Sequence, residues 1–331
     1  KLLFGTVEAD VMQNAMIYFL ISAFSFPFLA VFNACAATYR SMGNSRISMQ
    51  VSVGMNIFNA SGNYVLIFGL GMGTAGAALY TLATRILGAL VMMALMKNQK
   101  NDVYVIYRNL LMWERSMVRR ILHIAIPNGV ENGLFQLGRV LVVSIISRFG
   151  TAQIAANAVA NNLDSMGCIA GQAMNLAMIT VVGQCMGAGE KEQAVWYTKK
   201  LWKFTYQITA AVNSIILLSL PFLLNVYSLS PEAWRYAFIL VCIHNGCAIL
   251  LWPTSFTMPN ALRASGDVKF TMVISVASMF VFRIGFSVVL GIYFGLGAIG
   301  VWIAMVLDWI CRVSFYVWRF CSKKWLDFKV I

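Results

Sequence analysis

Two stretches of this sequence repeat one pattern: Arg40–Val53 reads RSMGNSRISMQVSV, and Arg263–Val276 reads RASGDVKFTMVISV. Each begins with a basic turn that contains glycine and continues into an apolar run. A glycine-rich break follows both copies, GMGTAG at Gly71–Gly76 and GLGAIG at Gly295–Gly300. The sequence therefore predicts an internal duplication, in which the repeated unit consists of membrane spans.

The composition is typical of a membrane protein. Of the residues, 60% are hydrophobic and only 11% are charged, whereas soluble domains carry roughly 25% charged residues. A membrane-spanning helix needs about 20 largely apolar residues. Segments of this length predict an all-α, polytopic protein with nine spans, at about residues 15–39, 47–68, 74–96, 121–147, 154–183, 204–227, 234–258, 268–293 and 297–320.

The net charge of +13 is explained by membrane topology. If the spans alternate in direction, 18 of the 25 Lys and Arg residues fall on one side. The positive-inside rule makes that side cytoplasmic, so we expect a cytoplasmic C-terminus and no nucleic-acid partner. The basic residues on this side are Arg40, Arg46, Lys97, Lys100, Arg108, Arg115, Arg119, Arg120, Lys191, Lys199, Lys200, Lys203, Arg263, Lys269, Arg319, Lys323, Lys324 and Lys329.

The duplication also predicts a longer parent protein. Spans one to three match spans seven to nine, so spans four to six need a counterpart, and its place is upstream of Lys1. We expect twelve spans in two parallel six-span lobes, of which nine are present here. The predicted divisions are 1–100 for the remainder of the first lobe, 101–120 for a cytoplasmic connector and 121–331 for the second lobe.

The sequence contains no motif of an enzyme or of an ATP-driven pump. The seven Cys residues are scattered, mostly within predicted spans and without CxxC spacing, so we interpret them as packing residues rather than metal ligands. There are only two His residues and no HExxH, GxSxG or Walker A pattern. We therefore expect no catalytic residue, metal or cofactor, and a supply of energy from an ion gradient or a partner subunit.

Several short motifs occur in a characteristic order along the chain. They are RSMGN at Arg40–Asn44, FGLG at Phe68–Gly71, Ile126–Pro127, GQCMGAGEKEQA at Gly183–Ala194, LRASGD at Leu262–Asp267 and Asp308–Trp309. With these motifs the chain resembles the multidrug and toxic compound extrusion (MATE) family over essentially its whole length, and it matches the family's fourth to twelfth spans. The resemblance implies a two-lobed, twelve-helix secondary transporter that exchanges H+ or Na+ for organic, often cationic, drugs.

Ionisable residues inside spans are costly, so each is a candidate for function. Glu131 follows Pro127 by four residues, where proline loosens the helix. The resemblance implies cation coupling by an acidic residue on this helix, in some members nearer the position of Phe135. Two interpretations stay open for Glu131: a coupling site, or a structural ion pair with Arg139 or with an arginine of the connector.

A polar arc marks the span at 154–183. At 3.6 residues per turn its side chains share one face, which we expect to line a watery cavity where Asp164 binds a cation, a proton or a positively charged substrate. The alternative is an Asn ladder that bonds neighbouring helices. The residues of the arc are Asn157, Asn161, Asp164, Gly171 and Asn175, with Cys168 between them.

Other polar residues of the spans have narrower predictions. His244 either joins a proton relay or packs as a hydrogen-bonded core histidine. We predict that Gln136 also lines the cavity. Asp308 and Arg312, four residues apart, should form a structural ion pair on one helix face. We interpret Arg263 as a cytoplasmic anchor rather than a ligand. Some Na+-coupled members have an Asp on the helix matching 234–258, and this sequence has none there.

Asparagines also mark the span at 47–68: Asn56, Asn59 and Asn63 share a helical face that either lines a cavity or bonds to another helix. The expected function is a cation-coupled antiporter that exports lipophilic organic cations, acting as a monomer in the plasma or inner membrane. The alternative is a flippase for lipid-linked oligosaccharides, which should have a strongly basic cavity. A third possibility is a receptor or assembly subunit that transports nothing.

Overall fold

The computed structural model describes residues 9–106 and 112–328 and divides the chain into two compact units, Lys1–Trp113 (unit 1) and Glu114–Ile331 (unit 2). The division falls inside the connector predicted at 101–120, of which residues 107–111 lie outside the described part. Both units are helical, and the described ranges contain no strand. The predicted all-α class is therefore confirmed.

Unit 1 consists of three long helices: α1 (Ala9–Ser41), α2 (Ser45–Tyr64) and α3 (Gly73–Met96). α2 continues directly into a wider π-helical turn at Val65–Gly69. Helix α1 packs most extensively on α3. Their shared core is apolar and consists of Phe32, Cys35, Ala36, Tyr39, Met92 and Met96.

Hydrogen bonds of an asparagine side chain connect α2 to α3. Asn59 Nδ2 lies 3.3 Å from the hydroxyl oxygens of Thr81 and Thr84, and Asn63 Nδ2 donates to Asn59 Oδ1 at 3.0 Å. A hydrogen bond between helices stabilises their packing inside a membrane. For Asn59 the structure thus supports the interpretation of a bond between helices.

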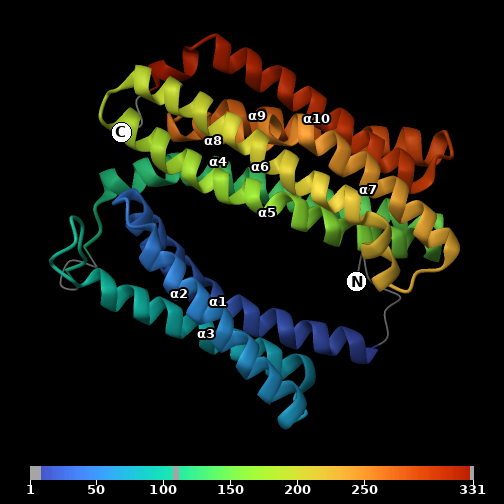
Figure 1. Cartoon of the computed structure of the whole chain (residues 1–331). Helices are drawn as coiled ribbons and strands as arrows, with labels where there is room; N and C mark the ends of the chain where they lie inside the picture. The colour runs from blue at the N-terminus through green and yellow to red at the C-terminus, as the bar shows by residue number, and fades with distance from the viewer. Residues whose placement is uncertain (1–8, 107–111, 329–331) are drawn as a thin grey trace. The chain divides into compact units, whose positions relative to one another are not determined.

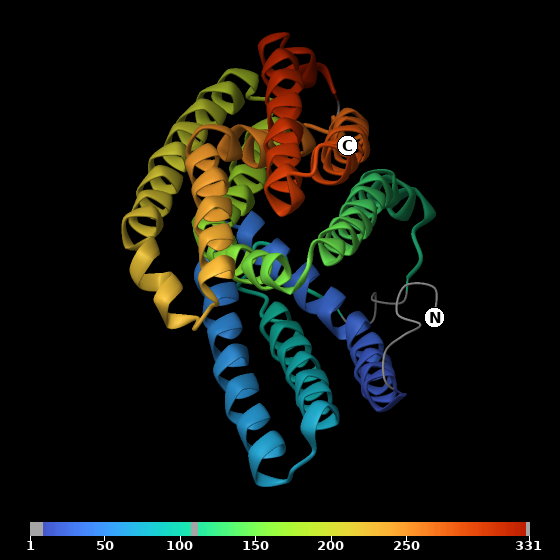
Figure 2. The same cartoon turned by 90° about the vertical axis from the view of Figure 1, so that its right-hand side faces the viewer.

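Unit 2 is one bundle of long helices, drawn from green to red in Figure 1 and seen from the side in Figure 2. Four of its spans contain interruptions: Pro127 and Pro221 lie inside α4 and α6, a π-helical turn separates α7 from α8, and two π-helical segments follow α9. The elements are α4 (Arg115–Ile146), η3 (Ser147–Phe149), α5 (Thr151–Gly187), α6 (Lys191–Val226), α7 (Pro231–Trp252), η4 (Pro253–Thr257), α8 (Met258–Ala264), α9 (Val268–Ser278), η5 (Met279–Gly285), η6 (Ser287–Tyr293), α10 (Gly297–Cys321) and η7 (Lys324–Asp327).

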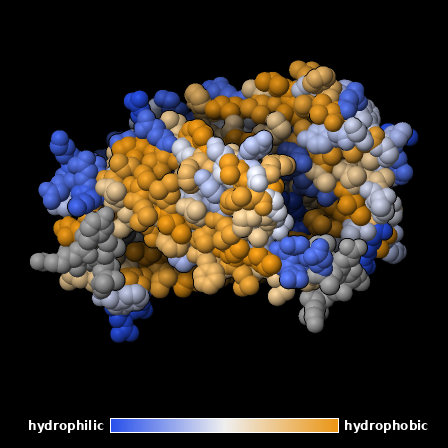
Figure 3. All heavy atoms as spheres, turned by 90° about the horizontal axis from the view of Figure 1, so that it is seen from below, coloured by the Kyte–Doolittle hydropathy of each residue, from blue (hydrophilic) through white to orange (hydrophobic). Residues whose placement is uncertain are grey.

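Eight helical segments of the described chain are long and apolar enough to cross a membrane. The face shown in Figure 3 is accordingly covered mostly by hydrophobic residues. The span predicted at 47–68 is helical but is not among the eight, because its Asn and Ser residues make it more polar. The eight segments are Met12–Ser41, Gly73–Met96, Arg115–Phe149, Thr151–Gly187, Lys191–Val226, Pro231–Ala264, Val268–Tyr293 and Gly297–Cys321.

Glycines let the helices of unit 2 approach closely. A Cβ added at Gly300 of α10 would lie 2.7 Å from the backbone of Leu290, and one at Gly171 of α5 would lie 2.1 Å from the Trp252 ring. Small residues allow this approach where the lipid supplies no hydrophobic drive for helix association. Gly171, predicted to face a cavity, is therefore a packing residue against α7.

The two copies of the repeated turn have the same backbone geometry. Gly43 and Gly266 both adopt positive φ, +77° and +98°, which glycine tolerates without a steric penalty. In the first copy the amides of Gly43 and Asn44 donate to the carbonyls three and five residues earlier, each at 3.0 Å. Gly266 and Asp267 repeat both bonds at the same distances. The duplication seen in the sequence thus extends to the hydrogen bonds.

The two glycine-rich breaks also correspond. In both copies a π-helical segment precedes the break: Val65–Gly69 in the first, and Met279–Gly285 followed by Ser287–Tyr293 in the second. Both breaks contain two glycines at positive φ, which end one helix and begin the next. These glycines are Gly71 (+65°) and Gly73 (+53°) in the first copy and Gly295 (+70°) and Gly297 (+58°) in the second.

Candidate cation and substrate site

A cavity of about 490 Å³ with both polar and apolar lining residues lies in unit 2. Residues of α4, α5, η4, α8, α9 and α10 form its wall, so it is enclosed by spans that are far apart in the sequence. Amides, hydroxyls and charged groups alternate there with two phenylalanine rings. The polar and aromatic lining consists of Asn128, Glu131, Asn132, Phe135, Asn175, Ser255, Phe256, Asn260, Arg263, Ser275 and Arg312.

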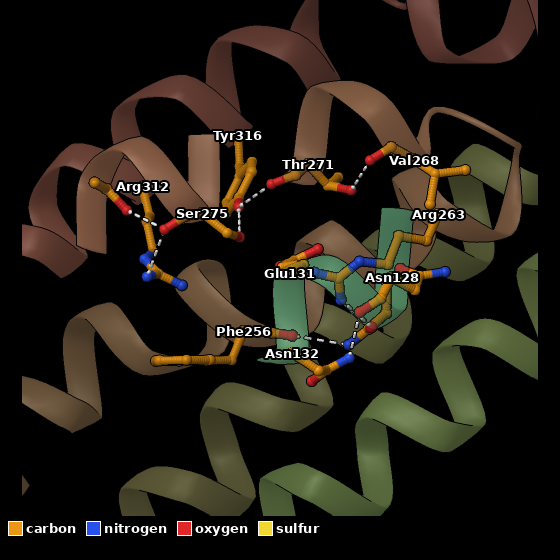
Figure 4. Close-up of polar contacts among 12 residues, drawn as sticks. Asn128, Glu131, Asn132, Phe256, Arg263, Val268, Thr271, Ser275, Arg312 and Tyr316 are labelled. Atoms are coloured by element: carbon orange, nitrogen blue, oxygen red, sulfur yellow. Dashed lines mark hydrogen bonds and ion pairs between the residues drawn. The ribbon is translucent and has the colours of Figure 1, made fainter. Parts of the chain in front are cut away.

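An ion pair between Glu131 and Arg263 stands at this wall (Figure 4). Arg263 Nη2 donates to Glu131 Oε1 at 2.5 Å, and Arg263 Nη1 donates to Asn260 Oδ1 at 2.9 Å. The Glu131 side chain is 10% exposed and that of Arg263 is 22% exposed. Within the described residues, Glu131 Oε2 and Arg263 Nε have no hydrogen-bond partner. Each member of the pair therefore keeps one group free for a ligand or a water molecule.

This pairing corrects two expectations. Among the described residues Glu131 pairs with Arg263 of α8, and not with Arg139 or with a connector arginine. Arg263, interpreted as an anchor, instead lines the cavity and holds the carboxylate. The two residues are 132 positions apart, so no local spacing in the sequence predicts their contact.

Local chemistry on α4 explains how Glu131 is presented. Pro127 lies inside the helix and has no N–H to donate, which leaves a backbone carbonyl without its usual partner. Two amide side chains bond to neighbouring carbonyls: Asn128 Nδ2 donates to Ile124 O at 3.1 Å, and Asn132 Nδ2 to Asn128 O at 2.8 Å. The turn before Glu131 is therefore supported by side chains that also line the cavity.

A second acidic cluster joins α5 to α7. His244 Nε2 lies 2.6 Å from Asp164 Oδ1, and Cys168 Sγ donates to the same oxygen at 3.3 Å. His244 Nδ1 lies 2.8 Å from Asn245 Oδ1, and the Trp302 and Trp309 rings meet the imidazole edge to face. Asp164 lines neither the large cavity nor the small one described next, so the two acids occupy separate places in unit 2.

The asparagines of α5 divide between two cavities. Asn157 and Asn161 line a small one of about 90 Å³, together with Arg139 and Arg283, whereas Asn175 lines the large one. Asn157 Oδ1 accepts a hydrogen bond from Trp302 Nε1 at 3.0 Å, so it also joins two helices. The asparagines of the arc thus line two separate cavities of unit 2.

The last span holds a buried charge cluster. Arg312 Nε donates to Asp308 Oδ1 at 2.9 Å, and Arg312 Nη2 donates to Ser275 O at 3.1 Å. Arg283 Nη1 approaches the other oxygen of Asp308, at 4.0 Å. The structure places Asp308 and Arg312 in the ion pair expected from their spacing. Asp308 thus compensates two guanidinium groups.

Sequence reasoning placed three residues in the cavity that line neither cavity, namely Gln136, Asp164 and His244, and it missed several others. Gln136 is exposed on α4 and lines neither cavity. Asn260, Ser275 and Arg312 do line the large cavity, although no expectation placed them there. Only a contact between distant spans brings them to one wall, so the sequence carries no signal for that position.

Comparisons with known proteins agree with this architecture. A family model described as MatE matches residues 127–289. The uncharacterized transporter YisQ of Bacillus subtilis (strain 168) is 27% identical over 301 residues, which cover 88% of this chain and 65% of the relative. The probable multidrug resistance protein NorM of Thermotoga maritima is 27% identical over 330 residues, which cover 98% and 70%. The chain thus spans about two thirds of the length of these relatives.

Solved structures show the same fold. An outward-facing multidrug resistance MATE family transporter of the MOP superfamily superimposes with a TM-score of 0.87 at 19% identity, covering 96% of this chain and 72% of that one. A MOP superfamily transporter from Pyrococcus furiosus also gives 0.87 at 19% identity, covering 98% and 73%. At this identity the likeness concerns the fold alone.

The long apolar helices define a multi-pass membrane protein, and the comparisons place it in the transporter class. The chain belongs to the MATE family, whose members are transporters and not enzymes. The family predicted from the sequence motifs is thereby confirmed.

Proposed function

We propose that the protein is a cation-coupled antiporter that exports lipophilic organic cations in exchange for H+ or Na+. The names of several relatives, probable multidrug resistance proteins, support this proposal. We further propose that it acts as a monomer in the plasma or inner membrane.

The observation that carries the proposal is that one carboxylate oxygen of Glu131 is paired with Arg263 and the other is not. A carboxylate inside a membrane span is costly and is kept where it handles ions or substrates. Arg263 neutralises one oxygen of Glu131, while the other oxygen is buried at the cavity wall without a partner among the described residues. The second oxygen is the place for a cation.

Exchange follows if the coupling ion and the drug use the same carboxylate in turn. A site that binds either cation but not both gives a negative coupling between them, and this coupling is reciprocal by thermodynamic necessity. The coupling ion arriving from outside then displaces the drug, and its departure inside lets the next drug molecule bind. The Phe135 and Phe256 rings line the same cavity as Glu131. They offer apolar surface to a lipophilic cation, and the Arg312 guanidinium lies over both rings, 5.3 and 5.7 Å from their centroids.

Transport by the purified protein in proteoliposomes tests this function. Export of a quaternary ammonium dye should follow an imposed H+ or Na+ gradient and should stop when that gradient is collapsed. A sulfonated dye with the same ring system is the matched control, and we expect it to be exported much more slowly because it is repelled by the carboxylate. Equal export of the two dyes, or export that ignores both gradients, would contradict the proposal.

We also propose that the chain is oriented with the repeated turns and the C-terminus in the cytoplasm. Ser45→Cys and Lys269→Cys should react with a membrane-impermeant maleimide only from the cytoplasmic side, and Ser230→Cys only from outside, because basic loops stay inside. The wild-type protein, with its own seven cysteines, gives the background labelling. Reaction of Lys269→Cys and Ser230→Cys from the same side would refute this orientation.

The flippase alternative is less well supported. A lipid-linked pyrophosphate needs a strongly basic cavity, but Glu131 and Asp308 neutralise Arg263 and Arg312 in unit 2. The charges around the large cavity are therefore mixed and do not form the strongly basic site that a pyrophosphate needs.

A further inference from the structure

Three side chains with different metal-ligating atoms meet between α5 and α7. The carboxylate of Asp164, the thiol of Cys168 and the imidazole of His244 each place one such atom within 4.8 Å of the other two. Asp164 and Cys168 are four residues apart on one helix, so they share a face, and His244 approaches that face from α7. An oxygen, a sulfur and a nitrogen thus surround one point.

His244 contacts a polar group with each ring nitrogen. Nδ1 lies 2.8 Å from Asn245 Oδ1, and Nε2 lies 2.6 Å from Asp164 Oδ1. An ionised carboxylate only accepts hydrogen bonds, so a proton or a metal ion between Nε2 and Oδ1 stabilises this contact. When Nδ1 carries the proton of the neutral ring, the lone pair on Nε2 is available to a metal ion.

The set of ligand atoms selects the kind of metal. A thiolate and an imidazole suit Zn²⁺ and softer ions, whereas Mg²⁺, Ca²⁺ and other hard cations prefer oxygen ligands throughout. Zn²⁺ at about 2.0 to 2.3 Å from its ligands keeps neighbouring ligand atoms about 3.3 Å or more apart. Cys168 Sγ and Asp164 Oδ1 already lie 3.3 Å apart. His244 Nε2 and Asp164 Oδ1, now 2.6 Å apart, must move to about 3.3 Å when the metal binds.

The surroundings hold the imidazole in place and leave one side open. Asn245 fixes the second ring nitrogen, as a hydrogen-bonding partner commonly does for metal-bound histidine. The rings of Trp302 and Trp309 pack against His244, whose side chain is 2% exposed, whereas that of Asp164 is 23% exposed. Three protein ligands with an exposed edge leave a fourth position for water or a substrate atom.

We infer that Asp164, Cys168 and His244 form a binding site for a soft divalent metal ion, Zn²⁺ or Cd²⁺. Metal ligands must be deprotonated. When the metal binds, two protons therefore leave to solvent: the one between Asp164 and His244, and the thiol proton of Cys168. Carboxylate and thiolate then balance the two charges of the ion. This inference is independent of the proposed function, since binding is measured without transport.

Titration of the purified full chain in detergent with Cd²⁺ tests the site. We expect about one tightly bound Cd²⁺ per chain, with the ultraviolet charge-transfer band of a cadmium–thiolate bond. Zn²⁺ should displace the ion, and Mg²⁺ and Ca²⁺ should not. Cys168→Ser should abolish the tight phase and its band. Cys242→Ser, which removes a half-buried thiol of α7 outside the cluster, should retain both.

Two further measurements separate a metal site from thiol reactivity or misfolding. Loss of a supporting partner of a metal ligand typically costs 10- to 100-fold in affinity, so His244→Gln and Asp164→Asn should weaken Cd²⁺ binding at least about tenfold. Saturating Zn²⁺ should raise the Tm of the wild type and of Cys242→Ser but not of Cys168→Ser, because a ligand of the folded state stabilises it. An unchanged Cd²⁺ titration in Cys168→Ser, or in both His244→Gln and Asp164→Asn, would overturn the inference.

Discussion

Replacement of Glu131 by Gln is expected to lower gradient-driven export by about 5- to 150-fold, the range of ordinary coupling free energies. Gln keeps the shape of the side chain and can still accept the hydrogen bond from Arg263, but it no longer attracts a cation. Arg263 remains 22% exposed to the cavity, so the variant should reach the membrane at a normal level. The measurement is export of the quaternary ammonium dye from proteoliposomes that contain equal amounts of protein.

A double variant separates a role in transport from a role in packing. If Glu131 served only to neutralise Arg263, then Glu131→Gln together with Arg263→Gln would restore export. If Glu131 binds the exchanged cations, the double variant stays inactive. The matched control is Asp327→Asn, which removes an exposed carboxylate that pairs with Lys191 and lines neither cavity, so we expect normal export. Restored export in the double variant would refute the assignment.

Replacement of Asp308 by Asn should destabilise the protein strongly, by about 3 to 5 kcal/mol, because breaking a buried ion pair leaves an uncompensated charge. Asp308 is fully buried and the Arg312 side chain is only 3% exposed. Arg283, at 4.0 Å and 15% exposed, depends on the same carboxylate. Thermal unfolding in detergent should show a much lower Tm and a smaller folded fraction.

The controls for Asp308 use its partner and a surface pair. Asp308→Asn combined with Arg312→Gln should recover part of the lost stability, since neighbouring charges are not additive. Asp327→Asn, which breaks an exposed pair with Lys191, should leave the Tm unchanged, because surface ion pairs contribute little. A Tm of Asp308→Asn equal to that of Asp327→Asn would contradict the compensating role of Asp308.

The features that the sequence predicted well are those set by local geometry. The repeated turns at Gly43 and Gly266 indicated the duplication, and they contain the same backbone hydrogen bonds. The pair of Asp308 and Arg312 follows from a spacing of four residues, which places both side chains on one face of a helix. Hydropathy predicted nine spans, eight of which are long apolar helices in the described structure, because length and apolarity are local properties.

The contacts that the sequence left open are those made between distant spans. Glu131 meets Arg263 across 132 positions, and a helix period says which residues share a face but not which helix that face meets. The arc on α5 was therefore recognised as polar, while its division between two cavities was not. His244 was left between a relay and a packing role, and only tertiary structure places it against Asp164.

The π-helical segments give the duplicated unit a tolerance for insertions. From the turn glycine to the first glycine of the break, Gly43–Gly71 in one copy and Gly266–Gly295 in the other, the second copy is one residue longer, and it contains one more π-helical segment. An added residue in an α-helix rotates everything beyond it by about 100°, which would turn apolar faces away from their partners. A π turn confines the added residue to one place in the helix. Each glycine break therefore keeps the same orientation relative to its repeated turn. A change of length within the span between turn and break leaves the contacts of the flanking helices intact.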